Sequence, residues 1–159
     1  MEWTEIINNP SLRDLPFKIE TNEWGQIVMS AATNKHSFLQ SEILVLLRQF
    51  EGKSFNECSI ETSKGVKVAD VVWCSTQFLQ RNGYETPYKE SPEICVEVIS
   101  PSNSKREMNE KRKLYFERGA REVWLCRENG KAEFYDRKGE IAKSDIFPQF
   151  PKEIEVSWR

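Results

Sequence analysis

The strongest strand in this sequence is Glu-Ile-Cys-Val-Glu-Val-Ile-Ser at positions 93–100. Apart from its two glutamates and the terminal serine it is wholly apolar, which is typical of a central strand covered on both faces. Pro101 ends the strand, and a polar residue among 102–104 can cap a helix that runs to about Arg118, where Gly119 closes it. A buried strand followed by a helix favours an α/β domain.

The predicted elements on either side of this strand complete one sheet. Upstream, we expect an irregular segment or short helical turn over 1–16, strands over 17–20 and 26–30, a helix from 33 or 34 to about 50, and strands over 57–62 and 66–73. Residues 75–92 should form a polar loop in which a helical turn is open. Downstream, strands over 122–126 and 131–136 precede an irregular packed tail. This order favours an α/β fold with one mixed β-sheet flanked by two main helices and with an N-terminal β-hairpin.

Length and composition indicate one ordinary globular domain. The chain has 159 residues, of which 38% are hydrophobic and 30% charged, so we expect a single domain over residues 1–159. No apolar run approaches the roughly 20 residues of a membrane-spanning helix. The N-terminus lacks the basic start and apolar stretch of a signal peptide. These features predict a cytoplasmic protein without a membrane partner.

Cysteine spacing and net charge bear on whether the chain has a zinc site or a nucleic-acid-binding surface. The four cysteines, at positions 58, 74, 95 and 126, include no CxxC pair, which disfavours structural zinc and favours packed free thiols. The net charge of −2 argues against a generic nucleic-acid coat protein. Residues 105–121 nevertheless carry seven lysines and arginines. This run is either a solvated helix face or a strip that faces phosphates.

Two carboxylates interrupt apolar strands. Asp70 lies in Val-Ala-Asp-Val-Val at 68–72, and Glu97 lies in Cys-Val-Glu-Val-Ile at 95–99. A buried charge is costly unless it is paired, protonated or metal-bound. If the strands are neighbours, the carboxylates lie about 5 Å apart, and a divalent cation would remove their repulsion. Such oxygen ligands suit magnesium or manganese; spacing alone leaves ordinary ion pairs open.

A helical lysine is the candidate partner of these carboxylates. Lys111 has Met108 and Tyr115 at i−3 and i+4 on its own face of the helix. These neighbours favour a face packed on the sheet, with Lys111 directed toward Glu97. There it could hold an attacking water or neutralise charge on a scissile phosphate. An exposed lysine whose stem covers apolar surface is the alternative.

Three residues nearer the N-terminus could support the site. His36, the only histidine, and Gln40 lie at i and i+4 on one side of the first main helix. Glu20 could approach from the opening hairpin. A structural histidine and an exposed hairpin carboxylate are the alternatives.

Several blocks of the sequence resemble a known nuclease family. They are Gly25–Ser30, His36, Val68–Trp73, Pro92–Ser102, Lys111–Tyr115 and Gly119–Trp124. Together they resemble the “putative restriction endonuclease” family abundant in cyanobacteria, a branch of the PD-(D/E)XK nucleases, over most of the chain. The resemblance implies a restriction-endonuclease-like core of helix, three strands, helix and strand. It also implies magnesium-dependent hydrolysis of phosphodiester bonds.

The resemblance further assigns roles to single residues. Asp70 and Glu97 match the two acidic residues of the motif. Ile99 stands where the parent motif has its lysine, and Lys111 matches a helical lysine that takes over in this family. Ala69 replaces the proline usually found before the aspartate, which affects backbone stiffness more than chemistry.

Two functions of different classes follow. The first is a DNA endonuclease with Mg²⁺ or Mn²⁺ on Asp70 and Glu97, with Lys111 assisting the attacking water. Related nucleases often cut both strands as dimers, so a homodimer stays open, although the sequence shows no coiled coil or obvious interface. The second is a catalytically weak or inactive nucleic-acid-binding or interaction module with the same fold. The missing lysine at position 99 and the slightly acidic net charge favour the second. A structural domain with ordinary ion pairs is a third reading.

Overall fold

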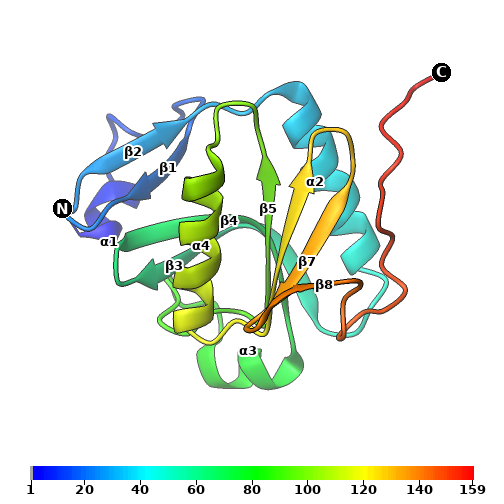
Figure 1. Ribbon diagram of the computed structural model, residues 1–159. Coiled ribbons are helices and arrows are strands. Elements are labelled where there is room, and N and C mark those ends of the chain that lie inside the picture. The colour runs from blue at the N-terminus through cyan, green and yellow to red at the C-terminus, as the bar shows by residue number, and fades with distance from the viewer. Residues whose placement is uncertain (1) are drawn as a thin grey trace.

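The computed structural model describes residues 2–159 and places a small hairpin beside a six-stranded sheet (Figure 1). In chain order the elements are α1 (Trp3–Ile7), β1 (Lys18–Thr21), β2 (Ile27–Ser30), α2 (Asn34–Leu47), β3 (Lys53–Thr62), β4 (Gly65–Cys74), α3 (Thr76–Asn82), β5 (Ile94–Ile99), α4 (Lys105–Glu117), β6 (Glu122–Arg127), β7 (Ala132–Asp136) and β8 (Gly139–Ile141). The six strands of the main sheet follow the order β3-β4-β5-β6-β7-β8.

The sheet is mixed and is covered by one main helix on each face. β5 and β6 run parallel, and every other neighbouring pair in this sheet is antiparallel. Helix α4 connects the parallel pair and crosses one face, while α2 lies on the opposite face (Figure 1). The predicted mixed sheet, its two flanking helices and the N-terminal hairpin are therefore confirmed.

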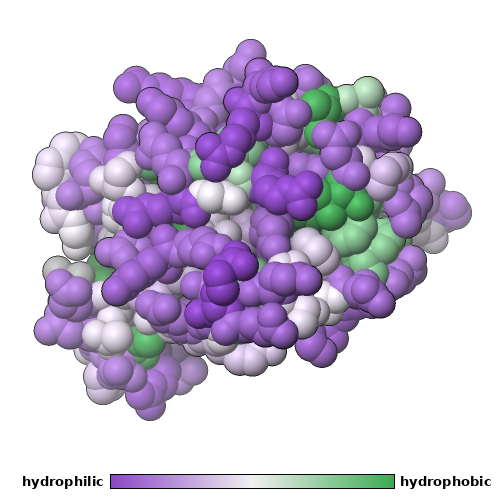
Figure 2. Space-filling view, turned by 90° about the horizontal axis from the view of Figure 1, so that it is seen from below, coloured by the Kyte–Doolittle hydropathy of each residue, from purple (hydrophilic) through white to green (hydrophobic). Residues whose placement is uncertain are grey.

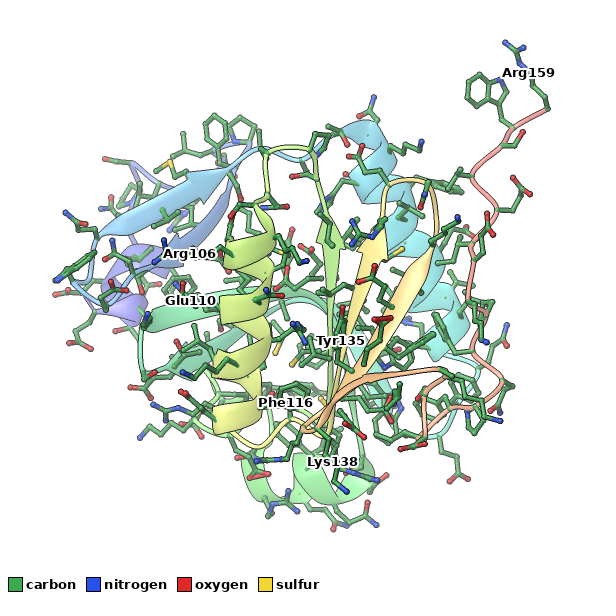
Figure 3. All side chains as sticks on the ribbon, in the orientation of Figure 1. Arg106, Glu110, Phe116, Tyr135, Lys138 and Arg159 are labelled. Carbon is green, nitrogen blue, oxygen red and sulfur yellow. The ribbon has the colours of Figure 1, made fainter. Side chains whose placement is uncertain are left out.

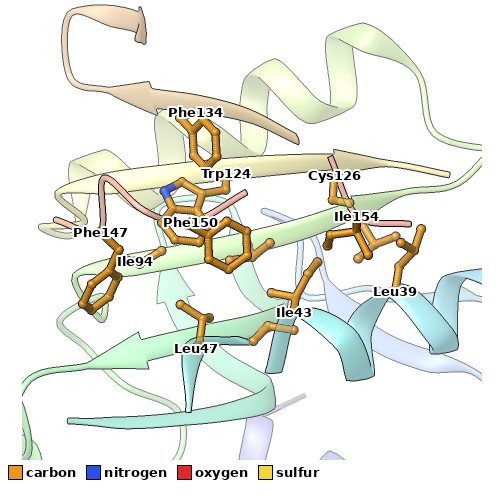
Figure 4. Packing of buried hydrophobic residues seen from close by; sticks show 13 residues of the cluster. Leu39, Ile43, Leu47, Ile94, Trp124, Cys126, Phe134, Phe147, Phe150 and Ile154 are labelled. Atoms are coloured by element: carbon orange, nitrogen blue, oxygen red, sulfur yellow. The ribbon is translucent and has the colours of Figure 1, made fainter. Parts of the chain in front are cut away.

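Side-chain alternation on β5 builds a core on each side. Ile94, Val96 and Val98 pack toward α2 with Trp124 and the C-terminal segment (Figure 4). Cys95 packs on the other side, with residues of α4. A strand buried on both faces has no solvent side, which explains why almost every position of β5 is apolar.

Helix α4 begins where the polar residues after β5 offer a cap. The Ser104 hydroxyl accepts the N–H of Glu107 at 3.1 Å, and Gly119 follows the helix with φ of 107°. The buried face of α4 comprises Met108, Lys111, Leu114 and Tyr115. A helix that buries a lysine must supply it with anionic partners, so this face points to the site.

The structure differs from the expected elements at their ends. β3 begins at Lys53 rather than at residue 57, because its polar first residues pair with the apolar end of β4. The expected polar loop contains α3, which Ser75 caps by accepting the N–H of Phe78. Residues 139–141 of the expected tail form β8, which pairs with β7.

The described residues contain no helix with both the length and the apolarity to cross a membrane. The face seen from below is mainly hydrophilic, with separate hydrophobic patches (Figure 2). The four cysteines are buried and free, as expected for packed thiols.

Candidate active site

The candidate site lies where β4 and β5 separate. Their backbone pairing ends at Val71 and Val96. One residue further on, the Asp70 carboxylate accepts the backbone N–H of Val98 at 2.8 Å. The register continued by one residue sets Asp70 opposite Glu97. The two carboxylates therefore lie on neighbouring strands, which is the condition that the sequence left open.

The N-terminal hairpin covers the part of β4 that has left β5. The Thr21 hydroxyl accepts the N–H of Val66 at 2.7 Å, and the Glu20 carboxylate accepts the N–H of Val68 at 2.7 Å. The Lys67 ammonium in turn donates to the Thr21 carbonyl at 2.8 Å. Side chains thus satisfy the free edge of β4, and β1 is fixed against the site.

A lysine from this hairpin lies between the two carboxylates. The Lys18 Nζ atom is 3.1 Å from Asp70 Oδ1, 3.3 Å from Glu97 Oε2 and 4.0 Å from Glu20 Oε2. Sequence reasoning missed Lys18. The available signal was its position two residues before Glu20, which puts both side chains on one face of a strand.

Lys111 reaches the same cluster from α4. Its Nζ atom is 2.9 Å from Glu20 Oε2 and 3.6 Å from Glu97 Oε1. One turn along the helix, the Tyr115 hydroxyl donates to Glu97 Oε1 at 2.6 Å. Lys111 is buried and directed toward Glu97, as its apolar neighbours predicted. Tyr115 is thus a third partner of Glu97, beside Lys18 and Lys111, although the sequence analysis treated it only as an apolar neighbour.

Helix α2 contributes the remaining candidates. Thr33 caps the helix by accepting the N–H of His36 at 3.1 Å, and the His36 Nε2 atom lies 3.4 Å from Asp70 Oδ1. Gln40, one turn later, is half-buried and makes no side-chain hydrogen bond to the described residues. Gln40 lines the same cavity as the acids of the cluster.

A cavity of about 620 Å³ opens onto the cluster. Its walls include Lys18 and all six residues singled out in the sequence, namely Glu20, His36, Gln40, Asp70, Glu97 and Lys111. The hairpin, the start of α2, the separating strands and α4 thus bring residues far apart in the chain to one hollow.

The surroundings of this cluster shift the pKa values of Glu97 and Asp70 in opposite directions. Burial raises the pKa of Glu97 to about 7 against the opposing effects of Lys111 and Lys18. At Asp70 burial acts in the same direction, but Lys18, His36 and the Val98 N–H outweigh it and hold the pKa below its usual range. The Asp70 carboxyl is therefore ionised at neutral pH, whereas Glu97 titrates near it.

Glu20 and Lys18 complete the charge balance. Burial disfavours the Glu20 carboxylate, but Lys111, Lys18 and the Val68 N–H outweigh it and lower its pKa. Burial also disfavours the Lys18 ammonium, yet three neighbouring carboxylates raise its pKa. With three carboxylates and two ammonium groups, the cluster has one excess negative charge whenever all its acids are ionised and His36 is neutral.

The donor set fits a hard divalent cation held by two carboxylates. Among residues 2–159, no group of three or more His, Cys, Asp or Glu side chains is arranged to hold a metal. Magnesium, however, is commonly bound through one or two carboxylates, with water and substrate phosphates completing its shell. The Lys18 ammonium lies within 3.3 Å of both Asp70 and Glu97, so the two acids already share one cation.

The basic run of α4 divides into two parts. Lys111 is buried in the cluster, whereas Lys105, Arg106 and Lys113 are exposed. Arg106 projects from the side of α4 near the hairpin (Figure 3). Arg112 lies over the Tyr135 ring, 3.8 Å from its centroid. The exposed residues fit a solvated helix face, and only Lys111 points into the site.

The chain is similar to one protein family and to a solved structure. No curated protein matches the chain. A crystal structure described as “a putative nuclease belonging to DUF820”, from Anabaena variabilis, shares the fold with a TM-score of 0.64. It is 19% identical, and the match covers 85% of this chain and 74% of that chain. Residues 14–157 match the Uma2 family, described as “Putative restriction endonuclease”, and the chain belongs to this family.

Proposed function

We propose that this chain is a metal-dependent DNA endonuclease of the PD-(D/E)XK type. The observation that carries the proposal is the convergence of Asp70 and Glu97 on one cation where β4 and β5 separate. Two acids that share a cation at the base of a cavity suit a reaction on a polyanion. Membership of a nuclease family supports the same chemistry.

In this proposal Asp70 and Glu97 hold Mg²⁺ or Mn²⁺. When bound, such an ion polarises a phosphoryl oxygen and lowers the pKa of a coordinated water. Asp70 is suited to this role because its second oxygen is fixed by the Val98 N–H at 2.8 Å. Glu97 is oriented by the Tyr115 hydroxyl at 2.6 Å. Both acids are thus held in place before any ligand arrives.

Lys111 would act on the phosphate and the attacking water. Its ammonium lies 3.6 Å from Glu97 and at the wall of the cavity. A positive group there can orient a water and stabilise the charge that builds on a scissile phosphate. Glu20, which is 2.9 Å from the Lys111 Nζ atom, positions it. Lys111 thereby supplies the cation that Ile99 cannot.

His36 and Gln40 support the site from α2. The imidazole is 3.4 Å from the Asp70 carboxylate and helps to keep it ionised, since contact with Asp70 raises the pKa of His36. Gln40 lines the cavity, and its amide offers a donor to a phosphate oxygen. DNA is the proposed substrate, and a homodimer would allow both strands to be cut.

A catalytically weak binding or interaction module is the second candidate. The observation that favours it is the lysine between the two acids, because its ammonium group pairs with both of them without any metal. Calorimetry with Mg²⁺ or Mn²⁺ discriminates the two, since such a module has no need of a metal at Asp70 and Glu97.

A plasmid-nicking assay tests the proposed activity. Supercoiled DNA is incubated with the protein in Mg²⁺, in Mn²⁺ or with a chelator, and open-circular and linear products are measured. We expect metal-dependent nicking that disappears in Asp70→Ala and persists in Asp145→Ala, which removes an exposed carboxylate outside the cavity. Equal activity of wild type and Asp70→Ala would refute the assignment.

A further inference from the structure

The Lys18 ammonium occupies the position between the two candidate metal ligands. It is 3.1 Å from Asp70 Oδ1 and 3.3 Å from Glu97 Oε2, and its side chain is 15% exposed. Lys111 contacts only Glu97 of this pair, at 3.6 Å, and is held at 2.9 Å by Glu20. Of the two lysines, Lys18 is therefore the one that bridges both acids.

The fold directs Lys18 to this position through the hairpin. Thr21 and Glu20 bind the backbone N–H groups of Val66 and Val68, which fixes β1 along β4. Because Lys18 lies two residues before Glu20, it points to the same side of β1. The packing of β1 on β4 therefore positions Lys18 between Asp70 and Glu97.

The charges of the cluster set Lys18 and a divalent ion in competition for Asp70 and Glu97. Asp70, Glu97 and Glu20 carry three negative charges when ionised, and Lys18 and Lys111 carry two positive charges. A divalent ion added to this set gives an excess of one positive charge in a buried cluster. With Lys18 withdrawn, the same ion leaves the cluster neutral, which is the less costly state.

We infer that Lys18 is the built-in counter-cation of this site, which binds Asp70 and Glu97 without metal and sets their affinity for divalent cations by competing for both acids. The inference rests on the proposed function only in taking these two acids as the metal ligands. The Lys18 side chain has room to move away from the two acids, because it is flexible and lines the cavity. Lys18 thus determines metal affinity without being a metal ligand.

Manganese titration of charge-removing and charge-keeping variants tests this inference. Lys18→Met removes the ammonium and keeps much of the stem, while Lys18→Arg keeps the charge. Lys67→Met is the matched control, because the Lys67 ammonium also joins the hairpin to β4 but donates to the Thr21 carbonyl rather than to Asp70 or Glu97. Binding of Mn²⁺ to the full chain is measured by calorimetry, and melting is followed with and without Mn²⁺.

We expect Lys18→Met to bind Mn²⁺ about ten- to a hundredfold more tightly than wild type, since the metal no longer displaces charged hydrogen bonds. Lys18→Arg and Lys67→Met should bind within about threefold of wild type. Without metal, Lys18→Met should melt below wild type, and saturating Mn²⁺ should raise its melting temperature more than that of wild type. If Lys18→Met is too unstable to fold without metal, Mn²⁺ should restore its folding.

Three results would overturn the inference: equal Mn²⁺ affinity of Lys18→Met and wild type, equal tightening in Lys18→Arg, or no binding to either protein. Metal binding and nicking together separate the role of Lys18 from the proposed nuclease activity. Metal-dependent nicking by wild type together with unchanged affinity in Lys18→Met rejects only the role of Lys18. Tighter binding in Lys18→Met without any nicking rejects only the nuclease.

Discussion

Glu97→Gln should remove most of the pH dependence of stability in the metal-free protein. Glu97 is 2% exposed, and burial raises its pKa from an ordinary 4.5 to about 7. An acid whose pKa is raised in the folded state keeps its proton there after the unfolded chain has lost it. Its contribution to stability is therefore complete below about pH 4.5 and is lost as the pH rises through about 7.

The size of this effect follows from the two pKa values. One pKa unit corresponds to about 1.4 kcal/mol, so a rise from 4.5 to about 7 corresponds to roughly 3 kcal/mol. Wild type should lose about this much free energy of unfolding between pH 5 and pH 8. Glutamine is neutral throughout and can still accept the Tyr115 hydroxyl, so the variant should match wild type at pH 5 and exceed it at pH 8.

Urea denaturation in chelator across pH 5 to 8 measures the difference. His36 adds a loss in the same direction, because contact with Asp70 raises its pKa and that stabilisation fades as the pH rises. The gap between wild type and Glu97→Gln therefore reports Glu97 together with the part of the His36 shift that the Glu97 charge causes. Glu140→Gln, at an exposed position of β8, is the control and should follow wild type. Parallel curves for wild type and Glu97→Gln would refute the reasoning.

Three further changes probe the parts around this acid. Lys111→Met should slow plasmid nicking by about a hundredfold or more while Mn²⁺ still binds in calorimetry, and an unchanged rate would remove Lys111 from catalysis. Tyr115→Phe deletes the 2.6 Å donor to Glu97 and should cost about 1–3 kcal/mol in urea denaturation; no loss would mean that this bond contributes nothing. Gly65→Ala places a Cβ 2.5 Å from the Thr21 carbonyl oxygen at a backbone φ of +87°. Hydrogen exchange should therefore show faster opening of β1, and unchanged protection would contradict the docking of β1 on β4.

The central strands and helix α4 could be predicted because their signals are local. An apolar run around Glu97 can be stable only as a buried strand, and Ser104 with Gly119 mark the ends of α4 through short-range capping. The inward direction of Lys111 followed from its apolar neighbours at helical spacing. These features need no knowledge of distant parts of the chain.

Lys18 could not be predicted in the same way, because its environment depends on contacts far along the chain. A lysine in a short hairpin is ordinarily solvent-facing. Here Thr21 and Glu20 dock the hairpin on backbone groups of β4, 45 and 48 residues away in sequence. That docking turns Lys18 toward Asp70 and Glu97. Strand β8, a three-residue pairing with β7, likewise depends on its partner more than on its own pattern.

Anomalous diffraction from crystals of the protein soaked in Mn²⁺ would locate the metal relative to Asp70, Glu97 and Lys18. We expect one manganese peak bound by the Asp70 and Glu97 carboxylates, with the Lys18 ammonium displaced from between them and Lys111 still beside Glu97. A map without manganese at these acids, under conditions in which the same protein nicks DNA, would contradict this expectation.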